Sequence, residues 1–378
     1  MEKIFILIPW FSPAYKAGGP VQSIANLVEL MQGEPFEFNI FCSIKDLDGT
    51  ILKDITADTW IPYNTNTSVF YSSDNNILAL LKQQIKKDKP AWVYINGIFD
   101  WNYNLKPILY CAAVSKIISP RGMLQKGAVG GKALKKKPFL ELLKLSGRLN
   151  DARWHATNEE EKNDILKYFP RAKDIVIVPN IPKRPVTAII NSNKKQGDLK
   201  LAYLSLIAKK KNLHLILQGM INAEMQSVVL DIYGPVKDKG YWEKKCLPLI
   251  SQLVGRVNYQ GGLDPAKVQS TLAAYDALVL LTKGENFGHA IYESLSAGRP
   301  ALISHFTPWN DLEKKPAGWN IDINDEEEIV SVLNRLVRMD NAEHRLFCEG
   351  AFGVAQDYYE KNEFTKAYGE MFRSSPGK

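Results

Sequence analysis

The sequence contains few cysteines and no long hydrophobic run. Its four cysteines, Cys42, Cys111, Cys246 and Cys348, lie far apart and form no C-x-x-C pair, which disfavours a disulfide framework and is typical of the reducing cytosol. No apolar stretch is long enough to span a bilayer, so no transmembrane helix is predicted. The apolar start is interrupted at Pro9, too early for the core of a secretory signal. We therefore expect a cytoplasmic protein whose first residues form a buried strand.

Common nucleotide and metal motifs are also absent. There is no G-x-G-x-x-G and no P-loop sequence, so a nicotinamide enzyme gains no support. The five histidines show no metal-ligand spacing. A D-x-D sequence, Asp46 to Asp48, is interpreted as a surface turn because no supporting pattern surrounds it. The sequence therefore predicts no bound metal and no cofactor.

The positive charge of the chain is concentrated in one segment. The net charge is +7, and residues 121–149 contain eight basic residues and one acid, Glu141. Within this segment, residues 132–149 interleave basic side chains with leucines, which suits the anionic inner face of the cytoplasmic membrane. The alternative is a core helix with a solvated basic face. No recognisable nucleic-acid module accompanies the charge, so nucleic acid is not an expected partner.

Apolar runs alternate with amphipathic stretches, the pattern of parallel sheets covered by helices. Strands are expected at residues 3–9, 37–43, 91–97, 116–120 and 152–157, then at 199–206, 227–234, 256–261, 277–282 and 300–304. Helices are expected at residues 20–31, 75–87, 103–114 and 159–168, then at 211–223, 240–254, 265–274 and 288–297. A segment rich in Pro, Asn and Lys, residues 178–198, separates the two series. We therefore expect two open α/β domains, residues 1–183 and 184–359.

Two loops that follow expected strands have the composition of ligand sites. In the first, Gly18 and Gly19 precede Pro20 at the start of a helix. Glycines let the backbone approach a ligand, and the helix amides attract anions. An ordinary helix start is the alternative. The second loop carries Glu285 and leads into a helix that carries Glu293, so both carboxylates can face one ligand, such as sugar hydroxyls, while the amides of the turn face an anion.

The second loop and its surroundings resemble a known enzyme family. "GENFGHAIYESLSAGRPALIS" is similar to the E-x₇-E region of the retaining glycosyltransferase family 4, which has the GT-B fold. The Gly-Gly loop, "ISPRGML", "DIYG" and "YQGGLDPAKVQSTLAAYDALVLLT" fit the same family. The resemblance implies an α/β protein with two Rossmann-like domains whose parallel sheets face each other across a cleft. It also implies that the last helix, at about residues 360–378, packs back on the first domain.

The resemblance assigns a role to each matching residue. Glu285 is expected to contact hydroxyls of the donor sugar, and Glu293 the ribose of the nucleotide. Lys211 is expected to neutralise the diphosphate, and Leu263 lies where the nucleobase rests. The backbone of Asn286, Phe287 and Gly288 is expected to hold sugar hydroxyls and diphosphate, and the Gly18–Gly19 loop to contact the donor.

Two positions depart from the family pattern. Leu206 stands where an arginine is common, and Lys209, Lys210 or Arg121 are candidates to replace that diphosphate cation. Asn96 stands where many relatives have a histidine. An asparagine cannot be a general base, so Asn96 is expected to hydrogen-bond the acceptor or the sugar.

Two histidines are further candidates. His155 ends an expected strand and is an acceptor-side candidate, with a structural histidine as the alternative. His289 lies in the turn before the Glu293 helix and is a phosphate candidate, with helix capping or packing as the alternative.

These residues predict a metal-independent, retaining glycosyltransferase of the hexosyltransferase type. We expect it to move a sugar from a nucleotide-diphosphate sugar to a glycan or polyprenyl-diphosphate-linked acceptor during synthesis of a surface polysaccharide such as O-antigen, capsule or exopolysaccharide. One alternative is another GT-B enzyme, a nucleotide-sugar epimerase or a phosphorylase. The other is a non-catalytic protein that binds sugar nucleotides.

Overall fold

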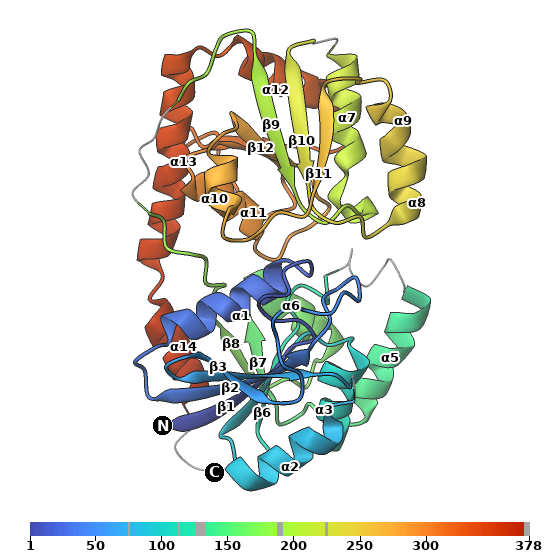
Figure 1. The fold of residues 1–378 in the computed structure, drawn as a ribbon, viewed down its shortest axis with the longest axis vertical. Coiled ribbons are helices and arrows are strands. Elements are labelled where there is room, and N and C mark those ends of the chain that lie inside the picture. The colour runs from blue at the N-terminus through green and yellow to red at the C-terminus, as the bar shows by residue number, and fades with distance from the viewer. Residues whose placement is uncertain (75, 112–113, 126–132, 187–191, 224–225, 374–378) are drawn as a thin grey trace. The chain divides into compact units, whose positions relative to one another are not determined.

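The computed structural model describes the chain except for residues 75, 112–113, 126–132, 187–191, 224–225 and 374–378. It divides into two compact units (Figure 1). The first contains Met1–Ile181 and Glu363–Lys378, and the second contains Pro182–Asn362. The boundary expected at residue 183 lies close to the start of the second unit.

The first unit is built on an eight-stranded sheet in the order β3-β4-β2-β1-β5-β6-β7-β8. Its strands are β1 (Glu2–Leu7), β2 (Phe36–Ser43), β3 (Trp60–Asn64), β4 (Thr67–Ser72), β5 (Trp92–Asn96), β6 (Lys116–Ser119), β7 (Arg153–Ala156) and β8 (Asp174–Ile177). All neighbours pair in parallel except β3 and β4, which are antiparallel. Central strands buried on both faces read as continuous apolar runs, which is why β1, β2 and β5 were recognisable in the sequence.

The helices of the first unit include the end of the chain. They are α1 (Gly19–Leu30), α2 (Leu78–Asp88), the π-helix η1 (Trp101–Leu105), α3 (Lys106–Tyr110), α5 (Ala133–Leu145), α6 (Glu159–Tyr168) and α14 (Phe364–Phe372). The ring of Phe372 packs against Phe36 and Phe38. In addition, Trp92 Nε1 donates to the Phe372 carbonyl at 2.7 Å, and Arg153 Nη1 to the Met371 carbonyl at 2.8 Å. Helix α14 is therefore part of the core of this unit.

The second unit has a six-stranded, wholly parallel sheet in the order β11-β10-β9-β12-β13-β14. Its strands are β9 (Leu199–Leu204), β10 (Val228–Tyr233), β11 (Val257–Gly261), β12 (Ala277–Leu280), β13 (Ala301–Ser304) and β14 (Gly318–Ile321). Its helices are η2 (Lys209–Lys211), α7 (Leu213–Asn222), α8 (Lys239–Tyr241), η3 (Trp242–Cys246), α9 (Leu247–Ile250), α10 (Val268–Leu272), α11 (His289–Ser296), α12 (Glu326–Arg338) and α13 (Asn341–Lys361). Figure 1 shows α7 and α9 on one side of this sheet and α10, α11 and α13 on the other.

The order of these strands decides which loops meet. Because β9 lies next to β12 and β12 next to β13, the segments that follow these three strands leave the same edge of the sheet. Those segments contain η2, the loop before α11, and residues 305–309. Within the described residues, no helix has the length and apolar character needed to cross a membrane.

Candidate functional site

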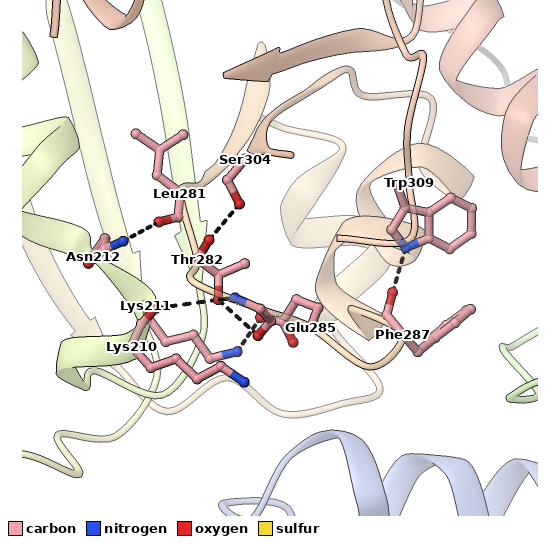
Figure 2. Close-up of polar contacts among 10 residues, drawn as sticks. Lys210, Lys211, Asn212, Leu281, Thr282, Glu285, Phe287, Ser304 and Trp309 are labelled. Carbon is pink, nitrogen blue, oxygen red and sulfur yellow. Dashed lines mark hydrogen bonds and ion pairs between the residues drawn. The ribbon is translucent and has the colours of Figure 1, made fainter. Parts of the chain in front are cut away.

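The loop that carries Glu285 joins β12 to α11 and is fixed at both ends (Figure 2). The side chain of Thr282 is fully buried. The backbone carbonyl of Thr282 accepts a 2.5 Å hydrogen bond from Ser304 Oγ, at the end of β13. The amide of Glu285 donates to the Phe306 carbonyl at 3.0 Å. The strand beside β12 therefore positions the backbone of Glu285. Phe306 was not among the residues expected from the sequence, because a backbone contact of this kind leaves no sequence signal.

The carboxylate of Glu285 forms an ion pair with the ammonium group of Lys211. Both side chains are mostly buried, with exposed fractions of 18% for Lys211 and 13% for Glu285. The neighbouring Asn212 has a left-handed backbone, with φ of 50°, and its Nδ2 donates to the Leu281 carbonyl at 2.9 Å. This bond ties the end of η2 to the end of β12. The sequence assigned Lys211 and Glu285 to different parts of a ligand, and the structure brings them into direct contact.

Gly288 makes the turn into α11 possible. Its φ is 81°, and a Cβ atom added there would lie 2.9 Å from Ile291 Cδ1, so a side chain would be strained in both conformation and space. The Phe287 carbonyl accepts a 2.6 Å bond from Trp309 Nε1, which holds the turn against the core. The first amides of a helix have no partner within it and carry partial positive charge. Such amides attract anions in general, and the role expected for Asn286, Phe287 and Gly288 stays a prediction.

Glu293 lies one turn into α11 and is partly buried. Burial raises the pKa of its carboxyl to about 7, and the nearby charge of Lys183 lowers it in part. The carboxyl group therefore changes charge near neutral pH. His289, at the start of the same helix, packs its ring 4.8 Å from the ring of Phe287. Leu263, in the loop after β11, packs half-buried against the core of the second unit.

In the first unit, Gly18 and Gly19 begin α1 as expected. Gly18 is the N-cap, has a φ of 74°, and would leave an added Cβ without any neighbour within 4 Å. The backbone, rather than crowding, therefore requires glycine here. The Gly18 carbonyl accepts the amide of Val21 at 3.1 Å, which closes the first turn of the helix.

Arg121 and Asn96 belong to a buried polar network in the first unit. The guanidinium of Arg121 donates to Asn96 Oδ1 at 3.2 Å, Asn180 Oδ1 at 2.5 Å and the Tyr94 hydroxyl at 2.7 Å. Arg121 itself has a φ of 52°. Its donors are thus directed into the unit. Asn96 is buried at the end of β5 with its Oδ1 occupied by Arg121, while its Nδ2 has no protein partner.

His155 lies in the same network and is fully buried. Its Nε2 is 2.8 Å from the Val178 carbonyl, and its Nδ1 is 2.6 Å from the Tyr94 hydroxyl. Since a carbonyl can only accept, Nε2 carries the proton and Nδ1 accepts from Tyr94. Burial and then the charge of Arg121 lower the pKa of His155 to about 3, so its ring is neutral. This geometry does not support His155 as an acceptor-side catalytic residue and favours the structural alternative.

Glu161 is a member of this region that the sequence did not single out. Its carboxylate accepts from the Gly122 amide at 2.6 Å, and from the amide and hydroxyl of Thr157 at 2.8 Å and 2.7 Å. The only sequence signal for Glu161 was its position in the first turn of a helix, and a glutamate there is usually explained by helix capping alone. As for metals, the described part of the chain contains no group of three or more His, Cys, Asp or Glu side chains able to hold one.

The segment that contains the Glu285 loop matches the model of a known protein family. Residues 187–349, most of the second unit, match the family model described as glycosyl transferases group 1. No curated protein matches the sequence.

Solved structures match over both units. Sucrose-phosphate synthase from Thermosynechococcus elongatus has a TM-score of 0.77 at 14% identity, covering 99% of this chain and 98% of that one. HepE from Anabaena, in complex with UDP and glucose, has a TM-score of 0.70 at 14% identity, covering 98% and 99%. WaaG, a glycosyltransferase involved in lipopolysaccharide biosynthesis, has a TM-score of 0.67 at 12% identity, covering 98% of both chains. The predicted fold class, two α/β domains of the GT-B type with mostly parallel sheets, is confirmed.

Proposed function

We propose that the protein is a retaining glycosyltransferase that moves a hexose from a nucleotide-diphosphate sugar to a hydroxyl of a glycan or lipid-linked acceptor. The contact between Lys211 and Glu285, at the strand ends of the second unit, is the observation that carries this proposal. The family match over the same unit supports it. So does the GT-B fold, which this chain shares with a protein crystallised with UDP and glucose.

Each residue of the loop has a chemical role in this proposal. Glu285 accepts hydrogen bonds from hydroxyls of the donor sugar, because a carboxylate is a strong acceptor. Lys211 orients Glu285 and lends positive charge to the diphosphate. The amides of the turn before α11 face the same anion. Glu293 accepts hydrogen bonds from the ribose hydroxyls when its carboxyl is ionised.

The reaction balances without a covalent enzyme intermediate. The bond from the anomeric carbon to the diphosphate breaks, and its electron pair goes to the departing phosphate oxygen. The acceptor hydroxyl forms the new bond on the same face of the sugar and gives its proton to that phosphate oxygen. The protein positions both substrates and stabilises the charge on the diphosphate. With lysines and helix amides in this role, neither a metal nor a cofactor enters the proposed reaction, and Asn96 serves only as a hydrogen-bonding group.

The surface of helix α5 supports a membrane as the place where the acceptor is bound. Leu140 and Leu143 of this helix are buried in the first unit, whereas Leu142 and Leu145 are 68% and 80% exposed. The helix is also basic, with Lys144 in its last turn; Lys132 of the segment 132–149 falls outside the described residues. Exposed leucines next to lysines fit an anionic membrane surface. We therefore propose a peripheral enzyme of surface polysaccharide assembly acting on a membrane-borne acceptor.

Ligand-dependent thermal unfolding tests the donor site. A nucleotide that binds only the folded protein stabilises it by about 2.7 kcal/mol at 100 times its Kd, so UDP, GDP and ADP are compared at millimolar concentration. One of them should raise Tm. Its hexose conjugates should then be consumed only when a glycan acceptor is present, with retention at the anomeric carbon. Consumption without any acceptor would indicate an epimerase, consumption that requires phosphate a phosphorylase, and stabilisation without turnover a binding protein.

A further inference from the structure

The first unit exposes a tryptophan in the turn that follows β5. Trp101 is the first residue of the π-helix η1 and is 55% exposed. Tryptophan is normally well buried on average, because its large ring gains free energy by leaving water. A large apolar side chain left in water and surrounded by polar groups is typical of a surface that contacts a partner. The function proposed above gives Trp101 no role.

Hydrogen bonds hold the backbone on both sides of Trp101. Asn104 is buried, and its Nδ2 donates to the carbonyl of Asn96, at the end of β5, at 2.9 Å. The Oδ1 of Asn104 accepts from the Asp100 amide at 3.0 Å. Asp100 caps η1, since its Oδ1 accepts from the Tyr103 amide at 2.7 Å. Trp101 is therefore exposed on an ordered turn that is fixed to the end of a central strand.

Aromatic contacts join this turn to helix α5. The ring of Phe99 packs against the ring of Phe139 in α5, with centroids 5.9 Å apart and an interplanar angle of 60°. The ammonium group of Lys136, also in α5, lies 4.4 Å from the centre of the Phe99 ring. The ammonium group of Lys106 lies 6.0 Å from the centre of the Trp101 ring. These five residues form one surface, called here the Trp101 surface, in which lysines lie over aromatic rings.

Charge and apolar exposure together favour an anionic bilayer as the partner. The segment 121–149, which includes α5, carries the equivalent of the whole net charge of +7. Next to the Trp101 surface, Leu142 and Leu145 of α5 are exposed as well. The ammonium group of Lys106 donates to Asn76 Oδ1 at 3.0 Å and has further donors to offer. An anionic bilayer complements both the lysines and the apolar side chains, and tryptophan is enriched at its interface.

We propose that Trp101 inserts into the interface of an anionic membrane and, together with α5, fixes the orientation in which the first unit binds the bilayer. This inference rests on the membrane-borne acceptor of the proposed function. The leucines of α5 enter the apolar layer, whereas the indole stays at the boundary, where its Nε1 donates to lipid oxygens. Lys106 interacts with lipid phosphate. A single helix leaves the unit free to roll about the helix axis, and a second contact removes that freedom.

Tryptophan emission in the presence of vesicles tests the position of the indole. The chain contains eight tryptophans, so the spectrum of Trp101→Phe is subtracted from that of the wild type. The difference should shift to shorter wavelength with vesicles that contain phosphatidylglycerol. Lipids brominated near the ester group should quench it more than lipids brominated near the chain end. Trp242→Phe, the same change at a half-buried tryptophan of the second unit, is the control, and its difference spectrum should not respond.

Flotation of matched variants measures how much the Trp101 surface contributes to binding. A half-exposed tryptophan still has roughly 100 Å² to bury, so Trp101→Ser should lower the vesicle partition coefficient about tenfold or more. Lys106→Gln should lower it about fivefold, the effect of one lysine near an anionic surface. Lys366→Gln is the control, because the Lys366 side chain is 65% exposed on α14, which Figure 1 shows on the opposite side of the first unit from α5. This variant should stay within about twofold of the wild type.

The outcomes separate this inference from the proposed function. An unshifted difference spectrum, or flotation of Trp101→Ser equal to that of the wild type, would show that Trp101 is not at the interface, and α5 alone would remain the membrane contact. Equal losses for Lys106→Gln and Lys366→Gln would also contradict the assignment, because only a diffuse field would then act.

Two further results would overturn the inference. A spectral response to soluble polyglutamate and none to vesicles would identify an acidic protein as the partner. If the wild type does not float with anionic vesicles and yet transfers sugar to a soluble acceptor, the membrane surface is wrong and the glycosyltransferase stands. Unchanged Tm values establish that the variants are folded.

Discussion

Lys211 Nζ and Glu285 Oε1 form an ion pair across 74 residues of sequence. The pair exists because β9 and β12 are neighbours in the sheet, so the turn after one strand meets the loop after the other. Both side chains are mostly buried, and each is thus held near its partner before any ligand arrives. A site arranged in advance loses less side-chain entropy on binding.

Glu285→Ala and Lys211→Met should each reduce turnover strongly. Each also leaves a mostly buried charge unpaired, which lowers stability, so the kinetics are measured at a temperature where each variant is folded. Removing a preorganised group that interacts with developing charge or with the reacting sugar lowers kcat by about 10²–10³. The double variant should lose much less than the product of the two single effects, since each residue positions the other. Steady-state kinetics of all three variants with one donor and acceptor measure this coupling. Independent, multiplicative effects would show that the ion pair has no functional role.

Glu293 should make both stability and nucleotide binding depend on pH. Its folded pKa, about 7, lies above the usual value of 4.5, so protonation favours the folded state. The protonated carboxyl thereby adds up to about 3 kcal/mol to the free energy of unfolding. This contribution is fully present below about pH 4.5 and is lost as the pH rises through 7. Glu293→Gln should therefore raise Tm relative to the wild type at pH 8 and not at pH 4.5. Glu313 is exposed, so Glu313→Gln is the control and should leave Tm unchanged at both pH 8 and pH 4.5.

The same ionisation should appear in ligand binding. Since the ionised carboxylate is the stronger acceptor for ribose hydroxyls, UDP affinity of the wild type should rise between pH 6 and 8 more than that of Glu293→Gln. Parallel pH profiles for the two proteins would argue against a ribose contact by Glu293.

The sequence predicted the local part of the site and could not predict its long-range part. The turn at Gly288 and the helix that carries Glu293 follow from neighbouring residues. The Lys211–Glu285 pair depends on the strand order β9-β12, which no local pattern encodes. The network of Arg121, Tyr94 and His155 likewise gathers residues from separate strands and loops. For this reason His155 looked like a candidate near a strand end, although it is sealed inside the unit.

Several elements were missed for different physical reasons. Strands β3 and β8 lie at the two edges of their sheet and are partly exposed. β3 contains Pro62, and β8 has only four residues, so neither gives the long apolar run of a central strand. Strand β14 has only four residues and contains Gly318 and Asn320. Helix α12, by contrast, had a clear signal: Asp325 caps it, three glutamates form its first turn, and Ile329, Leu333 and Leu336 make one buried face.

Gly288→Ala should destabilise the protein and impair the proposed donor site together. A left-handed alanine costs about 1–3 kcal/mol, and its Cβ would also contact Ile291 Cδ1. Gly353→Ala is the matched control, because Gly353 lies in α13 with open space around an added Cβ. That change should stabilise by about 0.5–1 kcal/mol. Urea denaturation measures both, and equal behaviour of the two variants would contradict the role given to the turn.

His155→Gln should lower stability without removing activity. The neutral ring bridges Tyr94 and the Val178 carbonyl inside the unit, and a disturbed buried hydrogen bond costs about 1–3 kcal/mol. Measured at a temperature where the variant is fully folded, its kcat should stay within about threefold of the wild type, far from the loss expected for a removed catalytic group. A hundredfold loss of kcat in a folded variant would restore His155 as a catalytic residue.

Membrane binding should depend on the exposed leucines of α5. Replacing Leu142 and Leu145 by serine removes apolar area that a membrane would cover, and each leucine contributes up to about 1.5–3 kcal/mol when fully buried. The double variant should therefore no longer float with vesicles that contain anionic phospholipid. Leu346→Ser is the control, because Leu346 is 60% exposed on α13, and this variant should float like the wild type.

The companion variant with Lys135, Lys136 and Lys137 changed to glutamate should lose binding to anionic vesicles, because its charge is reversed. Neutral vesicles should retain little of any form, since leucines alone bind weakly without the basic residues. If both α5 variants float with anionic vesicles as well as the wild type does, helix α5 is not a membrane contact.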